Sequence, residues 1–122
     1  MEIQIIHEEF TISRVANLDQ VDWTDTFCFV AKTDEELSLV CRTSRVPDNT
    51  VAREDGWRAL RIQGILDFSL IGILSKITSP LAQNQIGIFA VSTYNTDYIF
   101  TKAEQFDGAV DVLKKNGYVF QE

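Results

Sequence analysis

One stretch of the sequence, residues 65–69, combines an acidic side chain with the predicted start of a helix. The first backbone N–H groups of a helix have no partner inside it, and together with the helix dipole they suit a carboxylate. The side chain of Asp67 could bind the ammonium of a ligand whose carboxylate lies on those N–H groups. Asp67 could equally be the N-cap residue that satisfies the helix's own donors. A ligand carboxylate would meet the turn formed by Asp67, Phe68, Ser69, Leu70 and Ile71.

A second group of small polar residues lies further along the chain, between two predicted strands. Tyr94 and Tyr98 flank this group, so it could line a polar pocket with aromatic walls. The alternative is ordinary turn chemistry, because Asn and Asp are common hairpin residues. The members of the group are Ser92, Thr93, Asn95 and Asp97.

The sequence offers little for catalysis or metal binding. His7 is the only histidine and has two acidic neighbours, so no Ser-His-Asp arrangement can be assembled. Cys28 and Cys41 have no second pair at zinc spacing, and the acidic run at residues 34–36 is typical of a solvated hairpin tip. No glycine-rich phosphate loop is present. We therefore expect no catalytic residue, no metal and no cofactor.

The composition of the 122 residues, 45% hydrophobic and 24% charged, predicts a compact folded protein and not a disordered chain. The net charge of −7 lies in the first half: residues 1–56 hold 12 acidic and 5 basic side chains, and residues 57–122 hold 6 of each. This balance argues against nucleic acid and anionic membranes as partners. No apolar run is long enough to span a bilayer, and no export signal is evident. We therefore expect a cytoplasmic protein with reduced thiols.

The second half has a clear order of predicted elements, β-α-β-β-α-β, which is the split βαβ arrangement of α+β, ferredoxin-like folds. The first helix has an apolar stripe and should be kinked or split at Pro80, with Ser79 capping the second piece. Thr101 and Glu104 fit a capping box for the second helix, which Asn116 and Gly117 end. The predicted strands are residues 57–62, 86–92, 98–101 and 118–120, and the predicted helices are residues 68–85 and 102–115.

The first half reads as the opening of the same unit. Residues 10–15 alternate as a strand, and residues 16–26 are a short helix or a loop. Residues 27–32 and 37–42 form a hairpin whose two-residue turn places Cys28 opposite Cys41, on a buried face. Residues 45–56 are a connector. We therefore expect two related halves, an abbreviated one at residues 1–56 and a complete one at residues 57–122.

Four stretches carry a resemblance to a known family: GILDFSLIGIL from Gly64, LAQNQIGIFAVST from Leu81, STYNTDYIF from Ser92 and TDEELSLVC from Thr33. They resemble the ACT domain, a small-molecule regulatory module of amino-acid metabolism. Gly64 and Asp67 match the spacing of its Gly-x-x-Asp turn, whereas Gly72 lies two residues beyond its shortest version. Across residues 8–121 the chain is similar to tandem-ACT proteins, including CASTOR-type arginine sensors and aspartate kinase regulatory regions.

The resemblance implies a non-catalytic regulatory module that binds an amino acid or related small metabolite at an interface between paired ACT units. A homodimer is expected as well, because such sheets leave edges that proteins rarely expose. The alternative function is a structural or dimerisation module that acts through protein contacts without a ligand.

Overall fold

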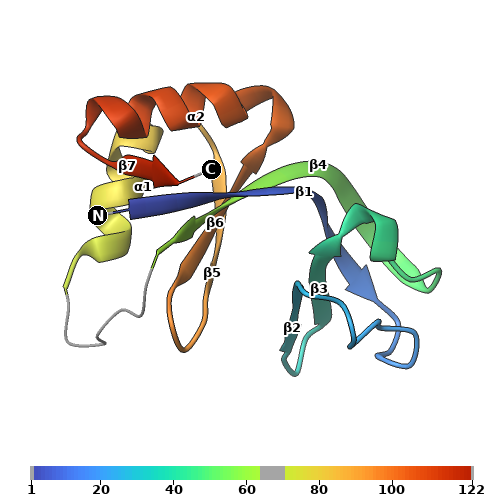
Figure 1. The fold of residues 1–122 in the computed structure, drawn as a ribbon. Coiled ribbons are helices and arrows are strands. Elements are labelled where there is room, and N and C mark those ends of the chain that lie inside the picture. Colours follow the sequence, from blue (N-terminus) through green and yellow to red (C-terminus); the bar gives the residue numbers. More distant parts are fainter. Residues whose placement is uncertain (1, 64–70, 122) are drawn as a thin grey trace. The chain divides into compact units, whose positions relative to one another are not determined.

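The computed structural model describes residues 2–63 and 71–121, which form two compact units. We call residues 1–7 and 58–122 the helical unit, and residues 8–57 the strand unit. Two long strands, β1 (Glu2–Val15) and β4 (Thr50–Ile62), contribute residues to both units (Figure 1).

The helical unit contains the predicted β-α-β-β-α-β order, which is confirmed. After β4 come β5 (Ile88–Ser92), β6 (Asp97–Lys102) and β7 (Val119–Gln121), and the strand order is β7-β1-β4-β6-β5. The first residues of β1 lie between β7 and β4, and Glu2 pairs with Val119 in parallel. This part of β1 was not predicted, because Ile5 and Ile6 are both buried and break the alternation expected of a strand.

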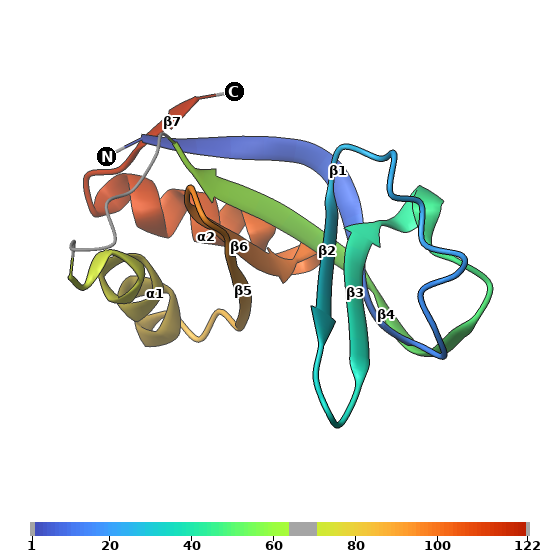
Figure 2. The same ribbon diagram turned by 90° about the horizontal axis from the view of Figure 1, so that it is seen from below.

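Two helices, α1 (Ile73–Gln83) and α2 (Ala103–Lys115), pack on one face of these strands (Figure 2). The fully buried Ile77 and Leu81 of α1 confirm the predicted apolar stripe. The predicted split at Pro80, with Ser79 capping a second piece, is wrong, because Pro80 lies inside one continuous helix; the alternative, a kink, stays a prediction. Proline removes one N–H, and Lys76, four residues earlier, is exposed, so water can serve its carbonyl. The buried core of this unit contains Ile3, Ile5, Leu60, Ile62, Ile77, Leu81, Ile99, Phe106, Ala109, Val110 and Leu113.

The start of α2 differs from the prediction, and its end agrees. Lys102 is the N-cap residue and makes no side-chain capping bond, so the predicted capping box at Thr101 is wrong. Thr101 remains in β6 with its side chain fully buried, because its β-branched side chain also suits a strand. Asn116 is the C-cap residue, and Gly117 follows with a φ of 90°, as expected of a helix stop.

The strand unit contains β2 (Cys28–Lys32) and β3 (Leu37–Arg42) beside the later part of β1 and the earlier part of β4, followed by a short 3-10 helix (Thr43–Arg45). The predicted hairpin is confirmed, since Cys28 pairs with Cys41. The predicted buried face is confirmed as well. Its cluster contains buried Val15, Val21, Leu39 and Cys41, packed by Leu18, Cys28, Val30, Leu37 and Val46.

For the two stretches of the first half that have no clear pattern, the predictions have different outcomes. Residues 16–27 form turns and contain no helix, so the loop alternative is correct. The connector predicted for residues 45–56 is wrong in its second part, because β4 begins at Thr50. Residues 51–55 are all exposed, so this end of the strand has no apolar alternation that would reveal it.

The two hairpins repeat each other at a fixed spacing of 60 residues. The cross-strand pair Cys28 and Cys41 in the first hairpin corresponds to the pair Ile88 and Thr101 in the second. Both turns close in the same way: Thr33 N–H donates to the Glu36 carbonyl at 3.0 Å, and Thr93 N–H donates to the Thr96 carbonyl at 2.8 Å. This register repeat supports the idea of two related halves, whose division at residues 56 and 57 stays a prediction.

Candidate small-molecule sites

The predicted ligand turn lies mostly outside the described residues, since Asp67, Phe68, Ser69 and Leu70 fall there. The structure does describe its flanks. Ile71 is 91% exposed, and Gly72 is the N-cap residue of α1 with a φ of 78°, a conformation that glycine adopts without strain. Gly72 has no side chain with which to cap α1.

The predicted polar group lies on the β5–β6 turn, where it serves partly as turn structure. The hydroxyl of Thr93 donates to the Thr96 carbonyl at 2.8 Å and accepts from the Thr96 N–H at 3.3 Å. Ser92 pairs across the hairpin with Asp97, and Asn95 is exposed at the tip. The structure brings Ser92, Thr93 and Asp97 together, and the turn interpretation accounts for Thr93.

Thr96, which the sequence reasoning missed, connects this turn to β4. Its side chain is buried, and its hydroxyl donates to the Ile62 carbonyl at 2.8 Å. Gln63, the next residue, donates its N–H to the Glu2 carbonyl at 2.9 Å and directly precedes residues 64–70. The polar turn therefore lies at the end of β4 from which the predicted ligand turn departs. The only sequence signal was the run of small polar residues itself.

Tyr98, which was expected to form an aromatic wall of the pocket, contacts an arginine of the helical unit. The guanidinium of Arg61 lies 5.7 Å from the Tyr98 ring centroid and donates to its hydroxyl at 3.3 Å. Arg61 also donates to the Gln4 side-chain oxygen at 2.6 Å. Tyr94, the other expected wall, is 79% exposed.

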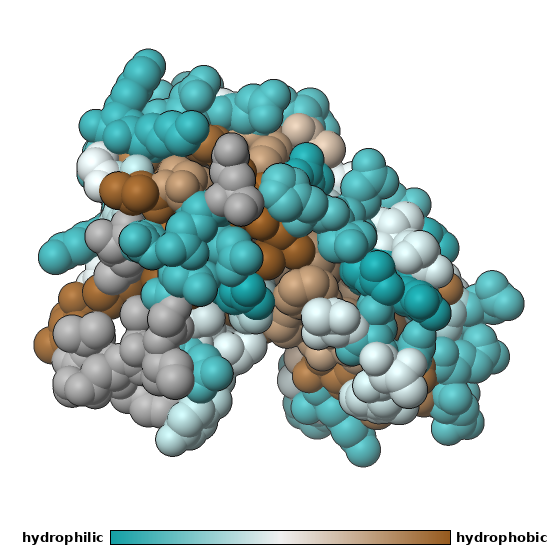
Figure 3. All heavy atoms as spheres, viewed as in Figure 1, coloured by the Kyte–Doolittle hydropathy of each residue, from teal (hydrophilic) through white to brown (hydrophobic). Residues whose placement is uncertain are grey.

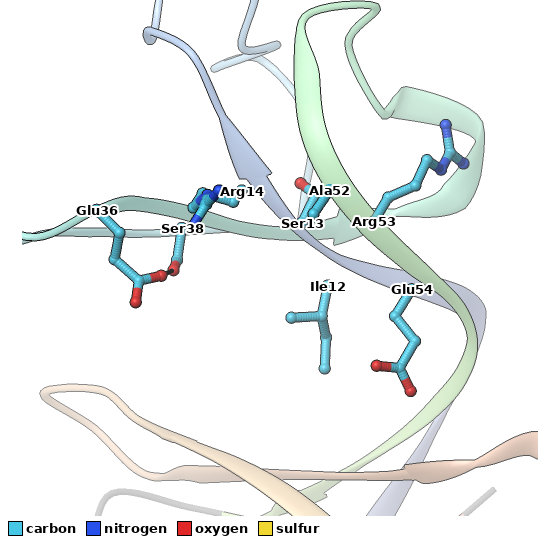
Figure 4. Close-up of a pocket in the computed structure, with 8 residues that line it drawn as sticks. All are labelled: Ile12, Ser13, Arg14, Glu36, Ser38, Ala52, Arg53 and Glu54. Carbon is cyan, nitrogen blue, oxygen red and sulfur yellow. Dashed lines mark hydrogen bonds between the residues drawn. The ribbon is translucent and has the colours of Figure 1, made fainter.

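A hollow of about 250 Å³ lies over β1, β3 and β4 of the strand unit (Figure 4). Within the described residues, the side chain of Arg14 makes no hydrogen bond or ion pair. Ser38 donates its hydroxyl to the carboxylate of Glu36. Arg53 donates to Asp55 at 2.9 and 3.1 Å and extends away from the other lining residues. The lining residues are Ile12, Ser13, Arg14, Glu36, Ser38, Ala52, Arg53 and Glu54.

Burial keeps the two thiols protonated at neutral pH. Burial raises the pKa of the Cys41 thiol to about 11 and also raises the pKa of Cys28. His7 is exposed on β1. The described residues hold no group of three or more His, Cys, Asp or Glu placed to bind a metal ion. In those same parts of the chain, no helix is long and apolar enough to cross a membrane.

The order of elements and the two helices on one sheet face define an ACT fold. The ACT domain family matches residues 52–115, and the chain belongs to that family.

Known proteins extend this assignment. The chain is 30% identical to a protein of known crystal structure from Agobacterium tumefaciens, with a TM-score of 0.87 over 98% of this chain and 91% of that one. It shares its fold with the regulatory subunit of aspartate kinase from Thermus thermophilus, at 8% identity and a TM-score of 0.66 over 93% of this chain and 95% of that one. A 60-residue stretch is 33% identical to the human cytosolic arginine sensor for mTORC1 subunit 1, covering 48% of this chain and 18% of the sensor.

Proposed function

We propose that this chain is a regulatory module that binds an amino acid or a related small metabolite where ACT units pair, and that it acts without catalysis. Its family relatives include an arginine sensor and regulatory parts of aspartate kinases, which supports a regulatory role. The observation that carries the proposal is the start of α1 at Gly72, a residue with no side chain to cap the helix, which follows the predicted Gly-x-x-Asp turn in the sequence. Such a start offers N–H donors to a ligand carboxylate.

The polar end of the helical unit supports the same placement. Thr96 holds the β5–β6 turn to Ile62, so Ser92 and Asp97 lie beside the end of β4. An amino acid carries an ammonium and a carboxylate a few bonds apart. We propose that Asp67 receives the ammonium and that residues 68–71 and the turn residues Ser92, Thr93, Asn95 and Asp97 complete the site.

A thermal-shift screen against all proteinogenic amino acids tests the proposal. A ligand present at a hundred times its dissociation constant adds about 2.7 kcal/mol of stability, which raises the Tm by several degrees. If no amino acid raises the Tm, an amino-acid ligand is excluded.

Asp67→Asn then tests the placement of the site. Asn caps helices about as well as Asp, so the unliganded Tm should stay within a few degrees. Loss of a charge-assisted hydrogen bond costs about 1.5–3 kcal/mol, which is roughly a 10- to 150-fold loss of affinity. An unchanged affinity in this variant would show that Asp67 does not bind the ligand.

A dimerisation module without a ligand is the second candidate, favoured by the exposed apolar side chain of Val119 on the short strand β7. We propose that two chains associate in either case. Light scattering at tens of micromolar protein should give twice the chain mass of 13.9 kDa. A mass of one chain would contradict the dimer. A dimer combined with a silent amino-acid screen would favour this second candidate.

A further inference from the structure

The two cysteines of the strand unit face each other across the β2–β3 hairpin. Cys28 pairs with Cys41 in the strand register, and both are free thiols in the same apolar cluster. The Thr33 N–H donates to the Glu36 carbonyl at 3.0 Å, so the pair that closes the turn is a hydrogen-bonded one. Hydrogen-bonded and non-hydrogen-bonded pairs alternate along an antiparallel ladder. Cys28 and Cys41 lie five pairs further on, so they form a non-hydrogen-bonded pair.

A pair of this kind has the spacing that a disulfide needs. The two Cα atoms of a non-hydrogen-bonded pair are about 4.5 Å apart, and disulfides join Cα atoms that are about 4.4–6.8 Å apart. Directly opposed side chains project from the same face of the sheet, and their Cβ atoms are closest in non-hydrogen-bonded pairs. The sulfurs of Cys28 and Cys41 can therefore be joined with little movement of either strand.

The surroundings of the two thiols decide which one reacts first and with what kind of reagent. Cys41 is buried, whereas Cys28 is half-buried, and hydrophobic side chains reach the surface over this hairpin (brown in Figure 3). Burial, and then the charges of Asp25 and Asp22, raise the pKa of Cys28. Residues 8–57 hold 11 acidic and 5 basic side chains, so the strand unit attracts a cationic reagent and repels an anionic one.

From this arrangement we propose that Cys28 and Cys41 are a modification site, a dithiol that a small cationic disulfide oxidises reversibly to a cross-strand disulfide. The Cys28 thiolate attacks one sulfur of the small disulfide, whose S–S bond breaks, and one half leaves as a thiol with the proton that Cys28 has lost. Cys41 then loses its proton and attacks the Cys28 sulfur, and the second half leaves as a thiol. Two electrons pass from the protein to the small disulfide. Because burial keeps both protein thiols protonated, the exchange is slow.

Equilibration of the full chain with cystamine, a cationic disulfide, and its reduced form cysteamine tests the site. After hours at mildly alkaline pH, free thiols are trapped by alkylation, and mass spectrometry measures the fraction of single chains that are lighter by two hydrogen atoms. This fraction should grow with the proportion of cystamine, and the oxidised chain should unfold at a higher urea concentration, because the bond restricts the unfolded chain. Chains that carry only cysteamine adducts, or that are joined to a second chain, would overturn the proposal. An oxidised chain that unfolds at a lower urea concentration would refute the fit of the bond to the hairpin.

A matched variant separates the pairing geometry from the presence of two thiols. Cys28→Ala combined with Val30→Cys keeps one cysteine on each strand of the hairpin and within the same apolar cluster, but makes the two cysteines diagonal neighbours. Diagonal positions lie about 7–8 Å apart, too far for a bridge without movement of the backbone. The equilibrium constant for oxidation should therefore fall at least about ten-fold below that of wild type. Oxidation of this variant to the same extent as wild type would refute the site.

The charge of the reagent and the link to the proposed function are tested in the same way. Glutathione disulfide is anionic, so its rate of exchange, relative to that with a neutral model thiol, should be lower than the relative rate of cystamine, and salt should narrow the difference. Equal relative rates at low salt would overturn the cationic class of reagent. Asp67→Asn should oxidise like wild type, because both cysteines lie in the strand unit. A silent amino-acid screen combined with normal oxidation would reject an amino-acid ligand and keep this site.

Discussion

The guanidinium of Arg42 donates two hydrogen bonds to the carboxylate of Asp25, from Nε to Oδ2 at 2.9 Å and from Nη2 to Oδ1 at 2.6 Å. Only 4% of the Asp25 side chain is exposed. Paired bonds of this kind fix direction as well as distance. They hold the irregular residues 16–27 against β3, in a unit that has no α-helix to cover its core.

Replacing Arg42 by Lys should destabilise the protein, because a single ammonium cannot reproduce the planar pair of donors. We expect Arg42→Lys to lower the free energy of unfolding by about 1.5–3 kcal/mol, measured by urea denaturation. Arg45→Lys is the control, because Arg45 is half-exposed and its single contact with Asp22 at 3.2 Å contributes about 0–1 kcal/mol. Equal stability of the two variants would contradict the role of the Arg42 pair.

The same contact makes stability depend on pH. The hydrogen bonds from Arg42 lower the pKa of Asp25 below its ordinary value. Its contribution is therefore fully present above the unfolded pKa, about 3.9, and is lost as the pH falls through the lower folded pKa. Urea denaturation between pH 7 and pH 3 should show a shallower loss of stability in Asp25→Asn than in wild type. Parallel curves would show that Asp25 does not contribute.

Two buried threonines should respond oppositely to loss of the hydroxyl. Thr101 Oγ1 is buried and has no hydrogen-bond partner among the described residues, so Thr101→Val should raise the free energy of unfolding by about 1 kcal/mol. Thr11 donates to Asp55 at 2.7 Å and contacts the Thr43 hydroxyl at 2.9 Å. Thr11→Val should therefore lower the free energy of unfolding by about 1.5–3 kcal/mol. Chemical denaturation of both variants measures the two changes in the free energy of unfolding. A destabilised Thr101→Val would refute the prediction for Thr101.

The two thiols should react slowly in the native protein. With a pKa of about 11, Cys41 is a thiolate in roughly one molecule in a thousand at pH 8. Labelling by a disulfide reagent should be slow until guanidinium chloride unfolds the chain. The variant Cys28→Ser isolates the reaction of Cys41. Rapid native labelling at both positions would contradict the buried pair.

How far the sequence predicts the fold depends on whether each element carries its own pattern. The apolar spacing of Leu74, Ile77 and Leu81 predicts α1, and the turn residues predict the register of Cys28 with Cys41. The start of β4 is exposed and carries no such pattern. Proline usually disfavours the interior of a helix, so Pro80 leads to the prediction of a split. The burial of Leu81 in the core outweighs that preference and keeps α1 continuous.

The candidate sites are less predictable, because their decisive contacts join distant residues. The hydrogen bond between Thr96 and Ile62 joins residues 34 positions apart, and the sequence near either residue does not predict that the two are in contact.

The parallel pairing of Glu2 with Val119 has a consequence for synthesis of the protein on the ribosome. On the order of a hundred residues separate the two partners, and at about 5–20 residues per second β1 waits roughly 5–20 s before β7 is made. During that interval Ile3 and Ile5, which belong to the core of the helical unit, have only part of their final surroundings. The strand unit needs no residue beyond Trp57, so we expect it to form first in the nascent chain. The helical unit must then close around a strand that was translated well before its two helices and its last strand.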